Sequence, residues 1–173
     1  MKKPLVGVLI GSDSDFEIIQ ECVKMLDKFD IPYDLKIASA HRTPEKTASY
    51  AKSARGKGIK VLIAAAGAAA HLAGVIASKT TLPVIGIPVH SSPLNGLDAL
   101  LSTAQMPGGV PVATMAIGKA GAKNAAIFAA QVLSLYDLKI EKKLEKFKEE
   151  LALEVENKEK KLTQKMQLKS RTA

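Results

Sequence analysis

The sequence predicts an α/β protein with a three-layer architecture: an open parallel sheet, helices on both of its faces, and a long C-terminal helix. Two observations support this prediction. Five short apolar runs alternate with helical patterns between residues 5 and 136, as in parallel strands joined by crossover helices. Beyond Asp137 the composition changes, since 19 of the last 37 residues are charged.

The first strands and helices follow from local patterns. Residues 5–11 form a short, β-branched apolar run that ends in a turn, which is typical of a buried parallel strand. Apolar side chains then recur at helical spacing over 14–29. The next strand, 33–39, alternates apolar and polar residues. Pro44 suits the first position of a helix that runs to one of the glycines at 56–58.

The same alternation continues through the second half of the domain. We expect strands at 61–67, 82–89 and 110–118, and helices at 70–79, 96–106 and from Ala120 onward. The resulting fold is flavodoxin-like or Rossmann-like, and such sheets bind ligands at the carboxyl ends of their strands. The loops of interest are therefore 11–15, 39–44, 67–74, 90–96 and 118–124.

The chain divides into a single α/β catalytic domain, residues 1–136, and a charged helical extension, residues 137–173. We expect the extension to continue the preceding helix and to rest one face on another surface. Its last residues, 163–173, are polar and are expected to fray. The apolar stripe of that face is Ile140, Leu144, Phe147, Leu151 and Val155.

Composition and charge exclude several classes of protein. The net charge of +8 is spread along the chain, and seven aromatic residues without tryptophan offer little stacking surface, so we expect no nucleic-acid partner. A mild positive field suits a small anionic substrate. No apolar run approaches the roughly 18 residues of a membrane span, and the amino-terminal run is too short for a signal peptide. Cys22 is the only cysteine, which excludes an intrachain disulfide and favours a cytoplasmic setting.

The first loop, Gly11 to Asp15, is rich in hydrogen-bond donors. The Ser12 and Ser14 hydroxyls, with the free amides of a helix start, suit a phosphate group, and the carboxylate of Asp15 suits ribose hydroxyls. Simple helix capping by the same residues is an equal alternative. The loop has neither the Walker spacing nor the GxGxxG pattern, which argues against an ATPase or a dinucleotide dehydrogenase.

The second loop places His41 and Arg42 side by side after Ser39. Arginine can hold a phosphate or carboxylate by two parallel hydrogen bonds. Histidine can give and take a proton near neutral pH. The alternative is a surface arginine beside a capping histidine, but the position at a strand's carboxyl end favours a functional role.

The third loop contains Gly67, Ala68, Ala69 and His71 within a run of small residues. Such a run allows close approach of backbone to ligand, and equally allows tight packing or a subunit contact. His71 is either a site residue or a helix cap. The three histidines lie 30 and 19 residues apart, so no metal site is expected. For the loop at 90–96, turn structure is the default and a pocket wall is the alternative.

Taken together, these loops resemble those of the PurE family, the phosphoribosylaminoimidazole carboxylases of purine synthesis. The resemblance covers roughly residues 4–136. It rests on six motifs in order, namely GSDSD at 11–15, SAHRTP at 39–44, AGAAAHLAG at 66–74, PVIGIPV at 83–89, GLDALLSTAQMPGGVPVAT at 96–114 and AGAKNAA at 120–126.

The resemblance implies an enzyme without metal or organic cofactor, acting on a ribonucleotide as a homo-octamer with its sites at subunit junctions. One branch of the family is a mutase that converts N5-carboxyaminoimidazole ribonucleotide (N5-CAIR) to 4-carboxyaminoimidazole ribonucleotide (CAIR). The other carboxylates aminoimidazole ribonucleotide (AIR) directly. Arg42 is typical of the mutase branch. A direct carboxylase is the near alternative, and a non-catalytic nucleotide-binding protein is the distant one.

The resemblance also assigns roles within the loops. Ser12, Ser14 and Arg42 would hold the phosphate, Asp15 would contact the ribose or the aminoimidazole, and His41 would be the general acid and base. Two residues depart from the family's usual AGGAAHLPG pattern: Ala68 replaces a glycine and Ala73 replaces a proline. A methyl at 68 could crowd a ligand if the position needs a positive φ, and loss of proline at 73 could loosen the loop.

Overall fold

In the computed structural model, which describes residues 3–171, five parallel strands form one sheet in the order β2-β1-β3-β4-β5. This is the flavodoxin-like strand order, so the predicted fold class is confirmed. In the register of the sheet, Val6 of β1 lies between Tyr33 of β2 and Val61 of β3. The strands are β1 (Val6–Ile10), β2 (Tyr33–Ile37), β3 (Val61–Gly67), β4 (Val84–Val89) and β5 (Ala113–Thr114).

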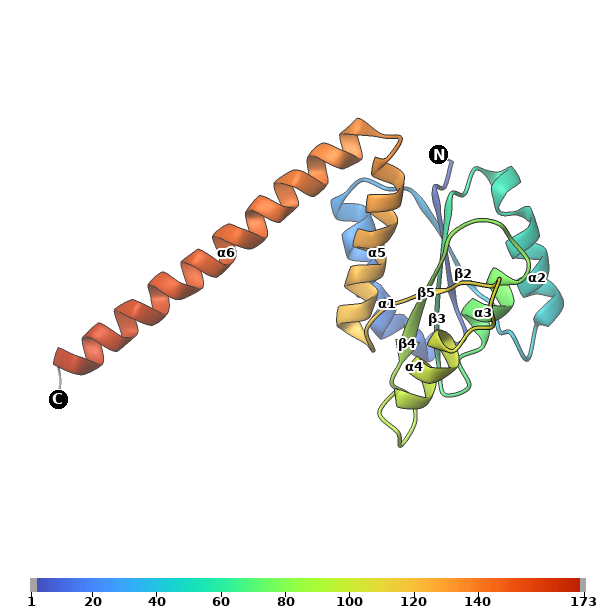
Figure 1. The fold of residues 1–173 in the computed structure, drawn as a ribbon, viewed down its shortest axis with the longest axis horizontal. Helices are drawn as coiled ribbons and strands as arrows, with labels where there is room; N and C mark the ends of the chain where they lie inside the picture. Colours follow the sequence, from blue (N-terminus) through green and yellow to red (C-terminus); the bar gives the residue numbers. More distant parts are fainter. Residues whose placement is uncertain (1–2, 172–173) are drawn as a thin grey trace.

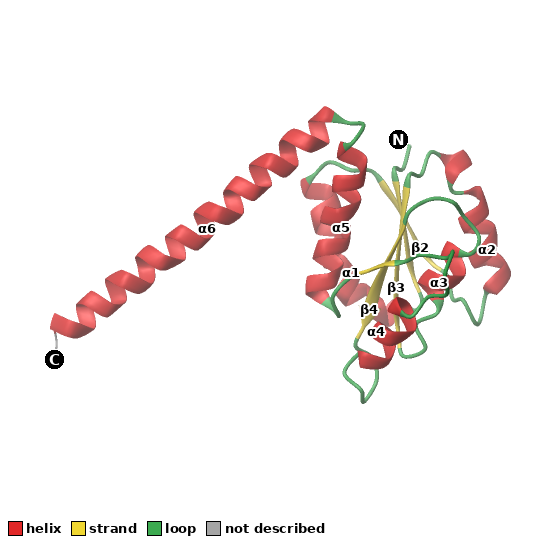
Figure 2. Ribbon diagram, viewed as in Figure 1, coloured by secondary structure: helices red, strands yellow, loops and turns green. Residues whose placement is uncertain are grey.

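Helices cover both faces of the sheet (Figures 1 and 2). The helices α1 (Phe16–Lys28) and α5 (Lys119–Ser134) cover one face, and α2 (Pro44–Ser53), α3 (Leu72–Ala77) and α4 (Leu97–Ala104) cover the other. Two 3-10 turns, η1 (Asp13–Asp15) and η2 (Arg55–Lys57), complete the domain. Successive residues of β1 face opposite layers: Val8 joins the core under α1 and α5, and Leu9 joins the core under α2 and α3.

The fifth strand is much shorter than the predicted 110–118. Only Ala113 and Thr114 form a regular ladder with β4. Pro111 has no N–H to donate, so the ladder lacks the hydrogen bond that this residue would otherwise supply ahead of Ala113. Beyond Thr114, single hydrogen bonds from Met115 N to Gly86 O and from Gly118 N to Pro88 O keep the chain beside β4.

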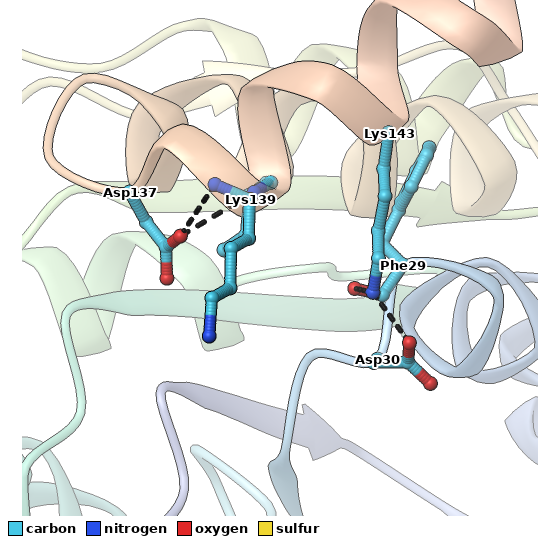
Figure 3. A network of polar contacts seen from close by, with 6 residues as sticks. Phe29, Asp30, Asp137, Lys139 and Lys143 are labelled. Carbon is cyan, nitrogen blue, oxygen red and sulfur yellow. Dashed lines mark hydrogen bonds and ion pairs between the residues drawn. The ribbon is translucent and has the colours of Figure 1, made fainter.

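The C-terminal extension is a separate helix, α6 (Leu138–Arg171). The prediction that it continues the preceding helix, α5, was wrong. The two helices are separated by a short turn that ends at Asp137. The Oδ1 atom of Asp137 accepts hydrogen bonds from the backbone N–H groups of Lys139 and Ile140 (Figure 3). An aspartate in this position caps the new helix, and α5 has already ended at Ser134. The division at residue 137 stays a prediction, as does fraying after residue 163; residues 172–173 of the predicted frayed end lie outside the described residues.

Only the first turns of α6 pack on the domain. Ile140 and Phe147 are buried, and the Phe147 ring meets the Phe29 ring edge-on at 5.6 Å between centroids. Lys143 Nζ donates to Phe29 O at 3.0 Å and pairs with Asp30 (Figure 3). The rest of α6 extends away from the body (Figure 1). Within the described residues, α6 and the other helices lack the combination of length and apolarity needed to cross a membrane.

Candidate active site

The carboxyl ends of β1, β2, β3 and β4 surround a cleft of about 310 Å³. The structure brings nine of the eleven predicted site residues to its wall. They are Gly11, Ser12, Ser14, Asp15, Ser39, His41, Arg42, Gly67 and Ala69. Ala68 and His71 lie outside the wall, although His71 contacts a residue in it.

The first loop caps a helical turn and also lines the cleft; the capping is confirmed, and phosphate binding stays a prediction. Ser12 N donates to Asp15 Oδ2 at 3.0 Å, and Ser14 N donates to Ser12 Oγ at 3.4 Å, which together form a capping box. Asp15 is 4% exposed, and this burial raises the pKa of its carboxyl above the ordinary value. Asp13 is exposed, and the hydrogen bond from the Ser12 hydroxyl lowers its pKa. The loop thus offers carboxylates with different proton affinities.

The second loop is built as a tight turn that presents Arg42. Ser39 Oγ accepts from Arg42 N at 3.1 Å, and the Thr43 hydroxyl donates to Ser39 O at 3.1 Å. The Arg42 guanidinium reaches across to donate one hydrogen bond to Gly11 O, also at 3.1 Å. A guanidinium has five N–H donors, so this bond fixes the group while leaving donors for an anion.

His41, in the cleft wall, forms a direct pair with His71. His41 Nε2 lies 2.8 Å from His71 Nδ1, and the rings are nearly perpendicular, with 5.0 Å between their centroids. His71 occupies the N-cap position of α3, but its side chain makes no capping hydrogen bond there. In a hydrogen bond between these two nitrogens, one carries the proton and the other accepts it, so the protonation of the two rings is linked.

The third loop brings backbone close to its neighbours. A Cβ on Gly67 would lie 1.8 Å from Ser91 Oγ, so only glycine fits there. Ala68 has a φ of +50°, the left-handed conformation that favours glycine. Its methyl group therefore strains the backbone rather than narrowing the cleft. Ala73 is the second residue of α3 and is buried, a position where a proline would also fit.

Three polar side chains at this edge, those of Ser91, Thr43 and Lys46, were not named among the predicted site residues, although a pocket wall was the alternative for the loop that holds Ser91. Ser91, which follows β4, lines the cleft beside Gly67. Thr43 and Lys46 line an adjoining groove of about 410 Å³ that shares Arg42 with the cleft. For Ser91 the available signal was its position at a strand's carboxyl end, and for Lys46 it was the place in the first turn of α2, directly after the loop that carries Arg42.

Comparisons of the sequence and of the structure with known proteins point to the same family. A family model described as AIR carboxylase matches residues 5–154. A Bacillus subtilis protein named N5-carboxyaminoimidazole ribonucleotide mutase is 56% identical over 147 residues, which cover 85% of this chain and 91% of that protein. A Pyrococcus horikoshii protein of the same name is 52% identical over 161 residues, covering 93% of this chain and 90% of the relative. The crystal structure of Treponema denticola PurE matches with a TM-score of 0.83 at 32% identity, covering 92% of this chain and 98% of that one.

Proposed function

The chain belongs to the AIR carboxylase family, and we propose that its cleft converts N5-CAIR to CAIR in purine synthesis with His41 as the proton carrier. The resemblance seen in the motifs and the mutase reading are confirmed by relatives above 50% identity that bear the mutase name. The observation that carries the role of His41 is geometric: His41 and Arg42 line one cleft with the donor-rich first loop.

We place the substrate phosphate between the first loop and Arg42. The hydroxyls of Ser12 and Ser14 and the free N–H groups of Arg42 supply donors on adjacent walls. Asp13 already accepts the Ser12 hydroxyl at 2.9 Å, so phosphate binding requires that hydroxyl to change partner. Asp15, deeper in the wall, is then placed to contact the ribose or the aminoimidazole.

The chemistry needs one group that both gives and takes a proton. Protonation of N5 by His41 lets the N5–carboxylate bond break, which releases carbon dioxide and leaves AIR. The electron-rich C4 of AIR then attacks the trapped carbon dioxide and forms the new carbon–carbon bond. Removal of the C4 proton by His41 restores the aromatic ring, so the protein ends in its starting protonation state.

Two features of the cleft support this cycle. The bond to His71 holds the His41 ring in one orientation, which favours proton transfer at a fixed geometry. The walls formed by Ala66, Gly67 and Ala69 have side chains no larger than methyl, which leaves room for carbon dioxide against the backbone. Confinement there keeps the released carbon dioxide within reach of C4.

We further propose that the enzyme is a homo-octamer with its sites at subunit junctions, as the family resemblance implies. The exposed apolar side chains Leu94, Leu97 and Leu101 form a patch around the start of α4, next to the loop that carries Ser91. Asp98 Oδ1 on the same helix is buried and has no hydrogen-bond partner within the described residues. Both features suit a covered surface.

The cytoplasm is the proposed location. Cys22 is fully buried in α1, and burial raises the pKa of its thiol to about 12. A cysteine that stays a thiol suits a reducing compartment.

The substrate test separates the two branches of the family. The purified protein is given N5-CAIR without bicarbonate, or AIR with high bicarbonate, and CAIR is followed by its ultraviolet absorbance. The proposal predicts rapid CAIR formation from N5-CAIR alone. Product only from AIR with bicarbonate would move the chain to the direct carboxylases, and product from neither would favour a non-catalytic binding protein.

A further inference from the structure

A second hollow lies beside β2, the strand at one end of the sheet order, and α2. It has a volume of about 240 Å³ and shares no wall residue with the candidate active site. A volume below roughly 300 Å³ suits a small ligand. We call it the lysine pocket, and its polar wall consists of Lys36, Lys46, Ser49, Tyr50, Ser53 and Lys57.

The three lysines of this pocket come from three different elements. Lys36 belongs to β2, Lys46 to the first turn of α2, and Lys57 to η2, so only the packed fold brings them together. Among the described residues, no aspartate or glutamate lines the same hollow. A concave surface lined by charges of one sign concentrates their field and attracts ions of the opposite sign. The lysine pocket is therefore suited to an anion.

Contacts within the chain position two of the ammonium groups. Lys46 Nζ donates a hydrogen bond to Ile37 O at 2.9 Å. Lys57 Nζ lies 4.8 Å from the centroid of the Tyr50 ring, in a cation–π contact. An ammonium group has three N–H donors, and each of these contacts leaves donors free. The fold thus holds both groups at the pocket while they can still donate to a ligand.

The net charge around the pocket is positive. Lys36 Nζ pairs with Asp34 Oδ1 at 3.1 Å, and Asp34 Oδ2 accepts a hydrogen bond from the Tyr50 hydroxyl at 3.0 Å. Burial raises the pKa of that hydroxyl well above its ordinary value, so it stays neutral. Three ammonium groups and the one carboxylate leave a net charge of 3 − 1 = +2. A phosphate group carries about −1.5 to −2 at pH 7, which matches this charge.

Hydroxyl groups on α2 add neutral donors to the wall. Lys46, Ser49 and Ser53 recur at spacings of three and four, so they share one face of the helix. The Ser53 hydroxyl donates to Tyr50 O at 3.2 Å, and the Ser49 hydroxyl makes no hydrogen bond to another described residue. Hydroxyl and ammonium donors together are the partners that phosphate oxygens accept.

We propose that the lysine pocket binds a phosphate group, either as the free ion or as the end of a small phosphorylated molecule. Its oxygens accept hydrogen bonds from the three ammonium groups and from the Ser49 hydroxyl. Lys46 also borders the groove that contains Arg42, so the bound phosphate lies next to the candidate active site but within a separate wall. The proposal does not depend on the chemistry assigned to that site.

Protection of individual lysines from acetylation tests this site in the full-length protein. A neutral acetylating reagent is applied in limiting amount, with sodium phosphate or with sodium chloride at equal ionic strength, and each lysine is quantified by peptide mass spectrometry. Lys36 and Lys57 report on the lysine pocket, because neither lines the cleft or the groove. Lys52, exposed on α2 outside the pocket wall, is the matched control. A parallel arm uses ribose 5-phosphate.

The proposal predicts that saturating phosphate slows acetylation of Lys36 and Lys57 by about fivefold or more and leaves Lys52 nearly unchanged, since a bound anion shields the amines that it contacts. In Lys57→Gln, protection of Lys36 should require about tenfold more phosphate, the order expected for a lost hydrogen bond to a charged group. Lys52→Gln should have a much smaller effect.

The two ligand arms identify the source of the phosphate group. Protection by ribose 5-phosphate as well as by phosphate would assign the pocket to phosphorylated molecules, and protection by phosphate alone would assign it to the free ion. Equal protection of Lys36, Lys52 and Lys57 would overturn the proposal, because it would reflect a general salt effect. Absence of protection at Lys36 and Lys57, or unchanged protection of Lys36 in Lys57→Gln, would overturn it as well.

Discussion

The two edges of the sheet use the same strands for different purposes. At the carboxyl edge, the strands are followed by loops that bring glycine, serine, histidine and arginine to the wall of a polar cleft. At the amino edge, leucine, proline and valine line an apolar groove, and α6 is anchored nearby. The candidate active site and the packing of α6 are thus separated by the length of a strand. A substitution at one edge is therefore expected to leave the structure of the other edge unchanged.

The largest effect is expected at the carboxyl edge from His41→Asn. Losing the proton carrier should lower kcat by about 10³-fold, within the range for general acid–base groups. Because asparagine keeps a polar side chain of similar reach, ribonucleotide binding should change little. Steady-state turnover and calorimetric binding measure the two quantities separately. Wild-type turnover in this variant would remove His41 from the mechanism.

At the amino edge, Phe147→Ala is expected to lower the free energy of unfolding by about 3 kcal/mol, because the ring is buried against Phe29. Leu153→Ala, at an exposed site on the same helix, should change it by less than about 0.5 kcal/mol. Urea unfolding measures both. Turnover in folded Phe147→Ala should equal that of the wild type, and a kcat loss comparable to that of His41→Asn would contradict the separation of the two edges.

Arg42→Lys tests how the carboxyl edge holds its anion. Lysine keeps the charge but loses the planar fork that bonds Gly11 O, so ribonucleotide affinity should fall by about tenfold. Lys46→Gln, in the adjoining groove, serves as the comparison and should cost less affinity. Binding titrations measure both. An equal loss in the two variants would mean that Arg42 acts only as a charge.

Ala68→Gly should stabilise the third loop. Alanine at a φ of +50° is disfavoured by roughly 1 kcal/mol relative to glycine, so the substitution should raise the free energy of unfolding by about 0.5–1 kcal/mol. Ala69→Gly, which relieves no such strain, should lower it slightly. Thermal or chemical unfolding gives both values. A decrease for Ala68→Gly would show that the loop tolerates alanine without strain.

The smallest expected effect comes from Asp15→Asn and depends on pH. Burial raises the pKa of Asp15 above 3.8, so the folded wild type binds a proton at this carboxyl more tightly than the unfolded chain does. The wild type therefore loses folding stability as the pH rises through the folded-state pKa of Asp15. The asparagine variant does not titrate there. Its stability relative to the wild type should therefore increase from about pH 4 toward neutrality. A relative stability that falls over this range would contradict the assigned direction.

The sequence predicted the layers, the strands and most of the cleft, because hydrophobic periodicity and turn residues are local signals. Two features lay beyond such signals, and a third was missed although a local signal for it was present. The His41–His71 contact joins residues 30 positions apart, so only the packed fold brings them together. The shortness of β5 depends on its edge position beside Pro111. The break before α6 was locally encoded by Asp137, but the helical periodicity on both sides obscured it.

Transfer of the carboxylate within the confined cleft is the central claim, and isotope retention tests it most directly. N5-CAIR labelled in its carboxylate carbon is converted by the enzyme in unlabelled bicarbonate, and the label in CAIR is measured by mass spectrometry. If carbon dioxide stays in the cleft between release and capture, most CAIR molecules will carry the label. CAIR whose label is diluted to the level of the surrounding bicarbonate would show that the carboxylate comes from solution, and would contradict the account.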